Sequence, residues 1–247
     1  MNAPRNTPKT APKTAMVLAA GLGTRMRPLT DDRSKAMIEV AGKPLIDHTL
    51  DRLADVGVER AVVNVHYMAD PLEAHLKARA HPKVVVSDER AGLLDSGGGI
   101  ALAAPHLGRD PILVANIDNV WIEHGAPALQ TLVDAWDPER MDILILLAAR
   151  DACYGYGRPE GFIRDDDGRL THSNNPSPPP PYNNIGFQII KPQLLDGLTG
   201  AFSILPIWKR LSAEGRLHGA VMDGEVIHVS DPAGRDHAER RLNAPVR

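Results

Sequence analysis

Short apolar segments alternate with amphipathic segments through the first 150 residues of this 247-residue chain. Residues 15–20 and 143–149 are apolar runs of the length that buried parallel strands have. Residues 44–56 instead carry apolar side chains at helical spacing; they begin with a proline and are followed by a glycine. Strands that alternate with helices need right-handed crossovers, which place helices on both faces of a mainly parallel sheet. The expected fold class is therefore α/β, a three-layer sandwich.

The chain is expected to form a single domain over residues 15–247, preceded by a tail. Residues 1–14 combine prolines and cations without an apolar run, which predicts a disordered N-terminal tail. The strands expected in the first half are 15–20, 61–65, 84–86, 112–115 and 143–149, and the helices are 44–56, 70–80, 97–104 and 125–136. After residue 150 the pattern predicts shorter strands and two helices that pack back onto the sheet: strands 161–164, 185–190, 219–222 and 226–229, and helices 205–214 and 232–242.

The charge balance limits the kinds of partner that this chain can have. Lys and Arg total 28 against 31 Asp and Glu, so the formal net charge is -3. No broad basic field is then available, which argues against nucleic acid or an anionic membrane as a partner. The single cysteine, Cys153, excludes an internal disulfide and a multi-thiolate metal site. Without a run long enough to span a membrane or a secretory signal, a cytoplasmic protein is expected.

A glycine-rich loop follows the first predicted strand, from Gly21 to Pro28. The dinucleotide-binding pattern G-x-G-x-x-G fails there because Met26 stands where the third glycine is needed, and no P-loop pattern occurs in the chain. A loop of this kind can still turn its backbone N–H groups toward an anion, and Arg25 adds a fork of donors that suits a phosphate. The loop therefore predicts a phosphate-binding site.

The sequence around this loop resembles a known family. The run L-A-A-G-x-G-T-R-M-x-P-L-T extends from Leu18 to Thr30, with Lys35 ten residues after the arginine and Gly-Lys-Pro at 42–44. In these residues the chain resembles the sugar-1-phosphate nucleotidyltransferases, and within them the N-acetylmuramate-1-phosphate uridylyltransferases and mannose-1-phosphate guanylyltransferase-like proteins. The resemblance implies a Rossmann-like nucleotidyltransferase fold, with a nucleotide-binding half at 15–150 and a sugar-binding half at 151–247.

The resemblance also implies which residues meet the substrates. The nucleotide would be held by Leu18, Ala20, Gly21, Gly23, Thr24, Arg25, Gly97 and Gly98. The catalytic residues would be Arg25, Lys35 and Asp118, and the sugar would meet Asn184 and Gly186. Chemistry agrees with such a site, because a sugar phosphate that attacks an α-phosphorus brings two anions together and needs cations and N–H donors. No general base is needed, since the nucleophile is already ionised.

The expected cofactor is Mg²⁺, held by Asp118 at the end of a buried strand. Many relatives have a second metal-binding aspartate, at the position where this chain has His228. Imidazole is a poorer Mg²⁺ ligand than carboxylate. Three arrangements stay open: His228 reaches the metal or a phosphate, Asp231 substitutes for the missing carboxylate, or Asp118, substrate and water hold the ion alone. A histidine that is simply packed or hydrogen-bonded is an equally acceptable interpretation.

The resemblance implies transfer of a nucleoside monophosphate from an NTP to a sugar 1-phosphate, by direct in-line attack, with release of pyrophosphate. UTP with N-acetylmuramate 1-phosphate is the first expectation. GTP with mannose 1-phosphate and a catalytically silent nucleotide-sugar-binding regulatory protein are the alternatives. Many relatives have Glu-Lys-Pro where this chain has Asn174-Asn175-Pro176, which argues against the glucose and deoxythymidine-sugar branches. The protein is expected to be a monomer or a small homo-oligomer.

Overall fold

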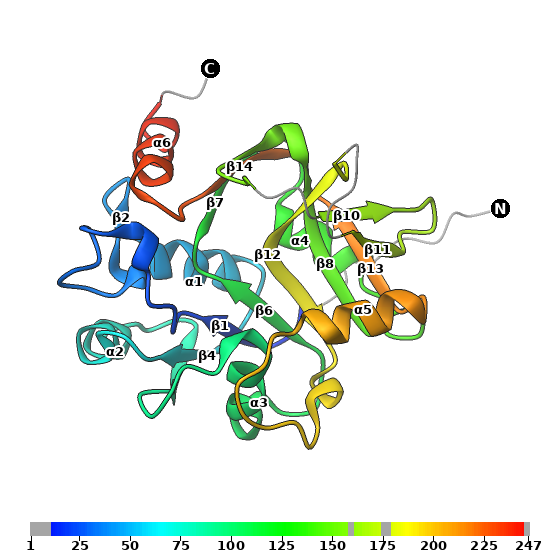
Figure 1. Ribbon diagram of the computed structural model, residues 1–247, viewed down its shortest axis with the longest axis horizontal. Helices are drawn as coiled ribbons and strands as arrows, with labels where there is room; N and C mark the ends of the chain where they lie inside the picture. The colour runs from blue at the N-terminus through cyan, green and yellow to red at the C-terminus, as the bar shows by residue number, and fades with distance from the viewer. Residues whose placement is uncertain (1–10, 158–160, 174–178, 245–247) are drawn as a thin grey trace.

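A central mixed sheet organises the molecule, as a computed structural model of residues 11–157, 161–173 and 179–244 shows (Figure 1). Along the sheet the strand order is β11-β10-β12-β6-β1-β4-β5, and β8 pairs with both β12 and β13. The strands are β1 (Thr14–Leu18), β4 (Arg60–Val65), β5 (Lys83–Asp88), β6 (Ile112–Asn116), β8 (Ile143–Ala149), β10 (Gly161–Arg164), β11 (Leu170–Ser173), β12 (Tyr182–Ile190) and β13 (Leu217–Val221).

The half of the sheet built from the first 120 residues is parallel throughout, as the sequence predicts. Strand β1 pairs in parallel with β4 and with β6, and β4 pairs in parallel with β5. Strand β12 then adds in the antiparallel sense to both β6 and β8, while β13 is parallel to β8. The α/β fold class is confirmed, with the antiparallel β12 joining the two parallel parts.

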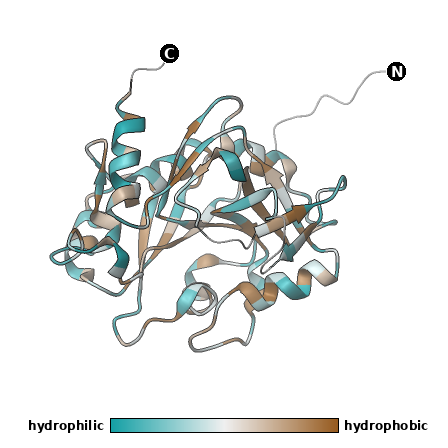
Figure 2. Ribbon diagram, turned by 45° about the horizontal axis from the view of Figure 1, so that its top comes forward, coloured by the Kyte–Doolittle hydropathy of each residue, from teal (hydrophilic) through white to brown (hydrophobic). Residues whose placement is uncertain are grey.

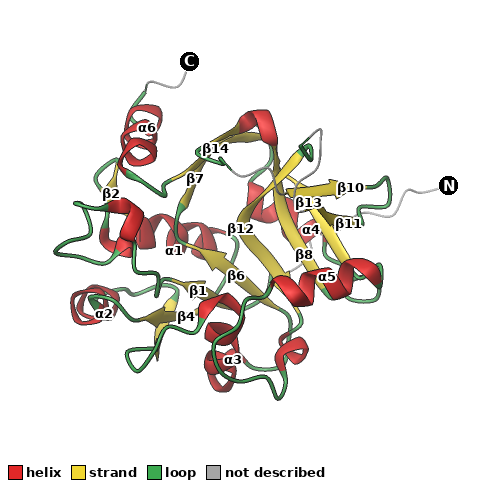
Figure 3. Ribbon diagram, viewed as in Figure 1, coloured by secondary structure: helices red, strands yellow, loops and turns green. Residues whose placement is uncertain are grey.

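Helices cover both faces of the sheet (Figure 3). They are α1 (Leu45–Asp55), α2 (Ala69–Lys77), α3 (Asp95–Leu107), α4 (Ala128–Ala135), α5 (Leu205–Ala213) and α6 (Pro232–Leu242). Side chains alternate along each strand, so Val17 of β1 faces the core shared with α1, α2 and α4, while Met16 faces the core shared with α3 and α5. These two apolar cores give the three layers, and Figure 2 shows apolar residues gathered along the central strands. No helix in the described part of the chain is long and apolar enough to cross a membrane.

A second, three-stranded sheet stands beside the central one, in the order β7-β14-β9. Its strands are β7 (Asn119–Glu123), β14 (Gly224–His228) and β9 (Cys153–Tyr154). The sequence analysis missed β7 and placed the following helix at 125–136, whereas α4 begins at Ala128. The reason is that β7 follows β6 after only two residues, Ile117 and Asp118, neither of which is a turn-forming glycine or proline. This small sheet packs with α6 against a third core.

The described chain begins with residues that already contact the domain. Strand β1 starts at Thr14, and Ala11 is buried, so the expected tail would be shorter than residues 1–14. Residues 1–10 lie outside the described part of the chain. A two-stranded ribbon of β2 (Glu39–Val40) and β3 (Lys43–Pro44) leads from the glycine loop into α1.

Candidate active site

Two clefts meet beyond the carboxyl ends of β1 and β6, where open α/β sheets bind ligands. The loop cleft, of about 350 Å³, is lined by the glycine loop, Leu18, Lys35 and Leu93. The β12 cleft, of about 680 Å³, is lined by residues of β7, β10, β12 and α5. Four residues line both clefts: Arg25, Asn116, Asp118 and Ser230. The sequence-predicted residues Gly21, Gly23, Thr24 and Lys35 lie in the loop cleft, and Asn184, Gly186 and His228 lie in the β12 cleft.

The glycine loop takes its shape from Gly23, whose φ of 63° lies in the left-handed region. A Cβ there would lie 3.0 Å from Cγ2 of Thr30 and 3.1 Å from Cβ of Lys35, so the chain passes too close for a side chain. The Gly23 carbonyl accepts hydrogen bonds from the Met26 N–H and the Thr30 hydroxyl, each at 2.9 Å. Met26 itself is fully buried, which explains why the position of a third glycine holds a core side chain here.

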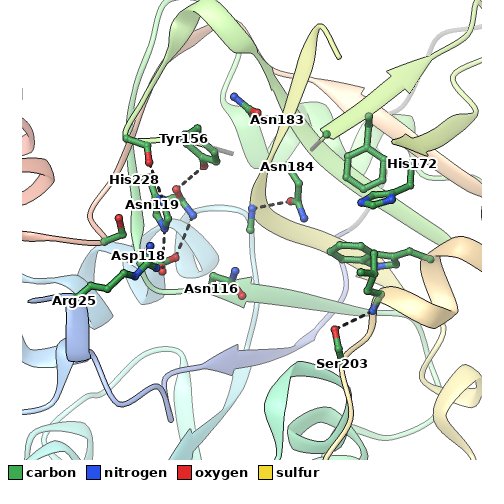
Figure 4. Close-up of a pocket in the computed structure, with 18 of the residues that line it drawn as sticks. Arg25, Asn116, Asp118, Asn119, Tyr156, His172, Asn183, Asn184, Ser203 and His228 are labelled. Carbon is green, nitrogen blue, oxygen red and sulfur yellow. Dashed lines mark hydrogen bonds and ion pairs between the residues drawn. The ribbon is translucent and has the colours of Figure 1, made fainter. Parts of the chain in front are cut away.

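Arg25 follows in the same loop, and its exposed side chain lines both clefts. In the β12 cleft it extends toward Asp118 (Figure 4). Within the described residues no carboxylate pairs with it. A cation that folding leaves without a partner is available to an anionic ligand.

Lys35 and Asp118 form an ion pair where the two clefts join, with Lys35 Nζ 2.7 Å from Asp118 Oδ2. They are 83 residues apart in sequence, and the Lys35 side chain is only 11% exposed. Burial alone would raise the pKa of the Asp118 carboxyl, but the charge of Lys35 and a contact with His228 outweigh it and hold that pKa well below its usual range. Asp118 is therefore ionised throughout the neutral pH range.

His228 is the second neighbour of Asp118, with Nε2 3.4 Å from Asp118 Oδ2. The antiparallel pairing of β14 with β7 places His228 opposite Asn119, directly beside Asp118. Its other ring nitrogen, Nδ1, lies 3.4 Å from the carbonyl oxygen of Gly155. His228 thus faces the site and is not a packed core residue.

Asn119 and Tyr156 extend this chain of contacts and were missed by the sequence analysis. The Tyr156 hydroxyl donates to Asn119 Oδ1 at 2.6 Å, and Asn119 Nδ2 donates to Asp118 Oδ1 at 3.2 Å. Burial, assisted by the negative charge of Asp118, raises the pKa of Tyr156 far above its usual range, so its hydroxyl remains a donor. Glycines flank Tyr156 in the sequence, and this pattern could have indicated that the backbone approaches another segment closely there. Gly155 has a φ of 83° and packs against the backbone of His228.

The described residues contain no cluster of three His, Cys, Asp or Glu side chains that could hold a metal by themselves. Of the two alternatives to His228, Asp231 also lines the β12 cleft, and its Oδ1 accepts the Gly234 N–H at 2.8 Å and caps α6. Asp118 and His228 offer one oxygen and one nitrogen ligand on the same side of the site. Mg²⁺ in proteins commonly takes one or two carboxylates and fills its other positions with phosphate oxygens and water, which fits this donor set.

A bulge in β12 shapes the floor of the β12 cleft between Asn184 and Gln188. Asn184 Oδ1 accepts the Gly186 N–H at 2.8 Å, and Gly186 has a φ of 82°. A Cβ at Gly186 would lie 2.9 Å from Cβ of Asn116, so glycine lets the bulge approach β6 closely. Trp208 of α5 also lines the cleft and donates from Nε1 to Gln188 Oε1 at 3.0 Å.

Gly97 and Gly98 are buried and lie outside the residues that line either cleft. Both N–H groups donate to the carbonyl of Phe202, and side chains at these positions would clash with Phe202 and Gly200. Glycine is therefore required at these two positions because the helix approaches the loop at Gly200 and Phe202 closely. A contact of these glycines with the nucleotide stays a prediction, and the Asn174-Asn175-Pro176 segment lies outside the described residues.

Comparison with known proteins supplies the family. Residues 15–165 match the MobA-like NTP transferase domain. The chain is 51% identical to N-acetylmuramate alpha-1-phosphate uridylyltransferase of Caulobacter vibrioides, over 92% of this chain and 96% of that protein. It is 30% identical to a UTP–glucose-1-phosphate uridylyltransferase of Haloferax volcanii, with the same coverage of 92% and 96%.

Solved structures of nucleotidyltransferases share the fold. UDP-glucose pyrophosphorylase in complex with UDP-glucose superposes with a TM-score of 0.77 at 17% identity, covering 93% of this chain and 98% of that one. The inositol-1-phosphate CTP transferase of T. maritima gives 0.75 at 16% identity, over 96% of this chain and 100% of that one. With the motif, the clefts and the relatives in agreement, the chain belongs to the sugar-1-phosphate nucleotidyltransferases and carries a MobA-like NTP transferase domain.

Proposed function

We propose that this protein transfers a uridylyl group from UTP to N-acetylmuramate 1-phosphate. The observation that carries the proposal is that two clefts of different character meet at the Lys35–Asp118 pair. A two-substrate transfer needs such an arrangement, because each substrate must be held separately while their reacting atoms lie together. The uridylyltransferase that is 51% identical supports the choice of base and sugar.

The loop cleft suits the nucleoside triphosphate. Gly21, Gly23 and Thr24 line a space of about 350 Å³, where their backbone N–H groups would donate to phosphate oxygens. The larger β12 cleft suits the sugar, whose hydroxyl and amide groups would meet Asn184 and the polar residues along β12. The sugar phosphate then reaches the α-phosphorus from the β12 cleft while pyrophosphate departs along the loop.

The chemical step is a displacement at phosphorus. An oxygen of the sugar phosphate forms a bond to the α-phosphorus as the bond to the bridging oxygen breaks, and pyrophosphate leaves with that electron pair. Lys35 neutralises charge at the α-phosphate, and Arg25 stabilises the departing pyrophosphate. Asp118 holds the Lys35 ammonium in place through the 2.7 Å contact. The site contains no residue that must act as a general base.

Mg²⁺ is proposed as the cofactor, held by Asp118 and His228. When bound, the ion would neutralise phosphate charge and align the reacting oxygens. Asp118 Oδ2 already contacts Lys35 and His228, whereas Oδ1 accepts one hydrogen bond, from Asn119 Nδ2 at 3.2 Å, so Oδ1 is the oxygen proposed to meet the cation. A cytoplasmic location, no nucleic-acid or membrane partner, and a monomer or small homo-oligomer belong to the same proposal.

A screen for pyrophosphate release tests this function. The four NTPs are each paired with N-acetylmuramate, N-acetylglucosamine, glucose and mannose 1-phosphates, and the Asp118→Asn variant reports release from any other site. We expect UTP with N-acetylmuramate 1-phosphate to give the highest kcat/KM. Preference for GTP with mannose 1-phosphate would replace the proposal with the guanylyltransferase alternative. Tight binding of a nucleotide sugar without turnover of any pair would instead indicate a regulatory protein.

A further inference from the structure

A buried polar pair lies beneath the loop cleft and takes no part in the mechanism above. Asn64, near the end of β4, accepts the Ala19 N–H at 2.6 Å and the Ala20 N–H at 3.2 Å with Oδ1. Its Nδ2 donates to Glu89 Oε1 at 2.7 Å. The other Glu89 oxygen, Oε2, accepts the Leu94 N–H at 3.3 Å. Together these bonds form a continuous link from residues 19–20 to residue 94.

The link is buried, and both carboxyl oxygens of Glu89 act in it as hydrogen-bond acceptors. Asn64 is 3% exposed and Glu89 is 2% exposed. Within the described part of the chain no cation pairs with the Glu89 carboxylate, so its neighbours satisfy it through N–H donors alone. A Cβ at Gly99 of α3 would lie 2.7 Å from Glu89 Oε1 and 2.9 Å from Asn64 Nδ2, so the helix keeps a glycine where it passes the pair. Burying a carboxylate without a cation costs free energy, and a buried polar network whose hydrogen bonds are satisfied makes the residues it joins rigid.

The two ends of the link adjoin two separate segments that form walls of the loop cleft. Ala19 and Ala20 lie between Leu18 and Gly21, and Leu94 follows Leu93; these three neighbours all line the cleft. We propose that Asn64 and Glu89 are positioning residues that set the separation of these walls and so the fit of the nucleotide. The same region holds the far end of the loop as well, because the Tyr67 hydroxyl donates to the Thr30 carbonyl and the Thr30 hydroxyl donates to Gly23.

Each side chain of the pair requires a particular hydrogen-bonding group on the other. Ala19 and Ala20 present N–H donors to Asn64, and Leu94 presents an N–H donor to Glu89. Asn64 must therefore turn its oxygen toward the loop and its NH₂ toward an acceptor at position 89. With Glu89→Gln, one amide NH₂ must face another donor whichever way the two amides turn. With Asn64→Asp, two carboxylates face each other in a buried site. In the double variant, Gln at 89 donates to Asp at 64, and every donor again meets an acceptor.

A double-mutant cycle tests the proposal on the full chain. Asn64→Asp, Glu89→Gln and the double variant are compared with the parent protein by KM for UTP, KM for the sugar 1-phosphate, and melting temperature. We expect each single variant to raise the KM for UTP about tenfold, because a buried polar group is left unsatisfied where the link holds the loop. The KM for the sugar phosphate should change less than about twofold, and the double variant should return the KM for UTP to within about threefold of the parent.

Asp142→Asn is the matched control for a purely structural loss. Asp142 binds Lys191 and Arg216 in a partly buried cluster outside both clefts. This variant should melt at a lower temperature with both KM values unchanged. The proposal is overturned if the Asn64 and Glu89 variants behave like this control, if both KM values rise together, or if the double variant restores nothing.

The inference rests on the proposed function only in that the loop cleft takes the nucleotide. If the screen selects another NTP, the KM for that NTP is measured in the same cycle. If no transfer occurs, the dissociation constant of the NTP, measured by calorimetry, takes the place of KM with the same expected pattern. Failure of the proposed function and failure of the positioning role are therefore separate results.

Discussion

The two clefts are built in opposite ways. The loop cleft is lined mainly by one continuous stretch, residues 18–35, which includes the glycine loop. Apart from Arg25, the β12 cleft is assembled from segments between residues 116 and 231 that meet only in the folded sheet, and side chains such as Asn184 and Trp208 line it. A phosphate chain is common to all nucleotides and can be held by backbone donors, whereas a particular sugar must be distinguished by side chains. We therefore expect a variant in either cleft to change the KM for one substrate. A variant at the Lys35–Asp118 pair, where the clefts meet, should instead change kcat.

Asp118→Asn should have the largest effect, because it removes the charge shared by both clefts. Lys35 would lose its partner at 2.7 Å, and the proposed metal would lose its carboxylate. We expect kcat to fall by about two orders of magnitude or more while the fold is retained, as measured by steady-state kinetics and circular dichroism. An activity within about threefold of the parent would remove Asp118 from the mechanism and leave the junction without a catalytic role.

Arg25→Ala should come next, since Arg25 also reaches both clefts but has no carboxylate partner within the described residues. Its loss should reduce kcat/KM by about a hundredfold. Because the side chain is exposed and supports no packing, the melting temperature should stay within about 2 °C of the parent. A collapse in melting temperature with normal activity per folded molecule would mean that Arg25 serves the loop structure and not the leaving pyrophosphate.

His228→Asp should have a smaller effect, on the metal requirement. If His228 is a ligand, an oxygen donor at this position should lower the Mg²⁺ concentration for half-maximal rate by a few-fold, because hard cations prefer oxygen. The added carboxylate also lies beside Asp118, so metal-free protein should melt at a lower temperature and recover when Mg²⁺ is added. A loss of stability that Mg²⁺ does not reverse, with an unchanged metal requirement, would contradict the ligand role.

The smallest effect on catalysis is expected at Asp142, outside both clefts. A hydrogen bond from Arg216, opposed in part by burial and assisted by Lys191, lowers the pKa of Asp142 to about 2. Because the folded-state pKa is depressed, the ion pair stabilises the protein above the unfolded pKa of about 3.9 and loses this effect as the pH falls toward 2. The parent should exceed Asp142→Asn in unfolding free energy by on the order of 2 kcal/mol at pH 7.

Urea titrations from pH 7 down to pH 2 measure that difference, which should narrow below about pH 4. Parallel kinetics at pH 7 should give unchanged constants for both substrates. A difference that stays constant down to pH 2, or a KM that moves, would show that this cluster does not act as an independent structural ion pair.

Residues of the loop cleft can be predicted from the sequence more directly than the side-chain contacts of the β12 cleft. The glycine loop and Asp118 follow the buried strands β1 and β6, whose ends meet at one edge of the parallel sheet, and Lys35 belongs to the motif that continues from the loop. The roles of Asn119 and Tyr156 depend on the register of β7 against β14 and on the path of the chain after β8, which local patterns do not encode. Gly97 and Gly98 illustrate a further limit: a glycine run indicates close approach of a backbone, but its partner here is the loop at Gly200 and not a cleft.

One paired measurement tests the division between the clefts most directly: both KM values of Gly23→Ala and of Asn184→Ala. Gly23→Ala strains a backbone with a φ of 63° in the loop cleft. Asn184→Ala removes the acceptor that holds the Gly186 N–H in the β12 cleft. We predict that Gly23→Ala raises only the KM for UTP and that Asn184→Ala raises only the KM for the sugar 1-phosphate, each by about tenfold. If both variants raise the same KM, or if their effects are exchanged, the assignment of the two clefts to the two substrates is wrong.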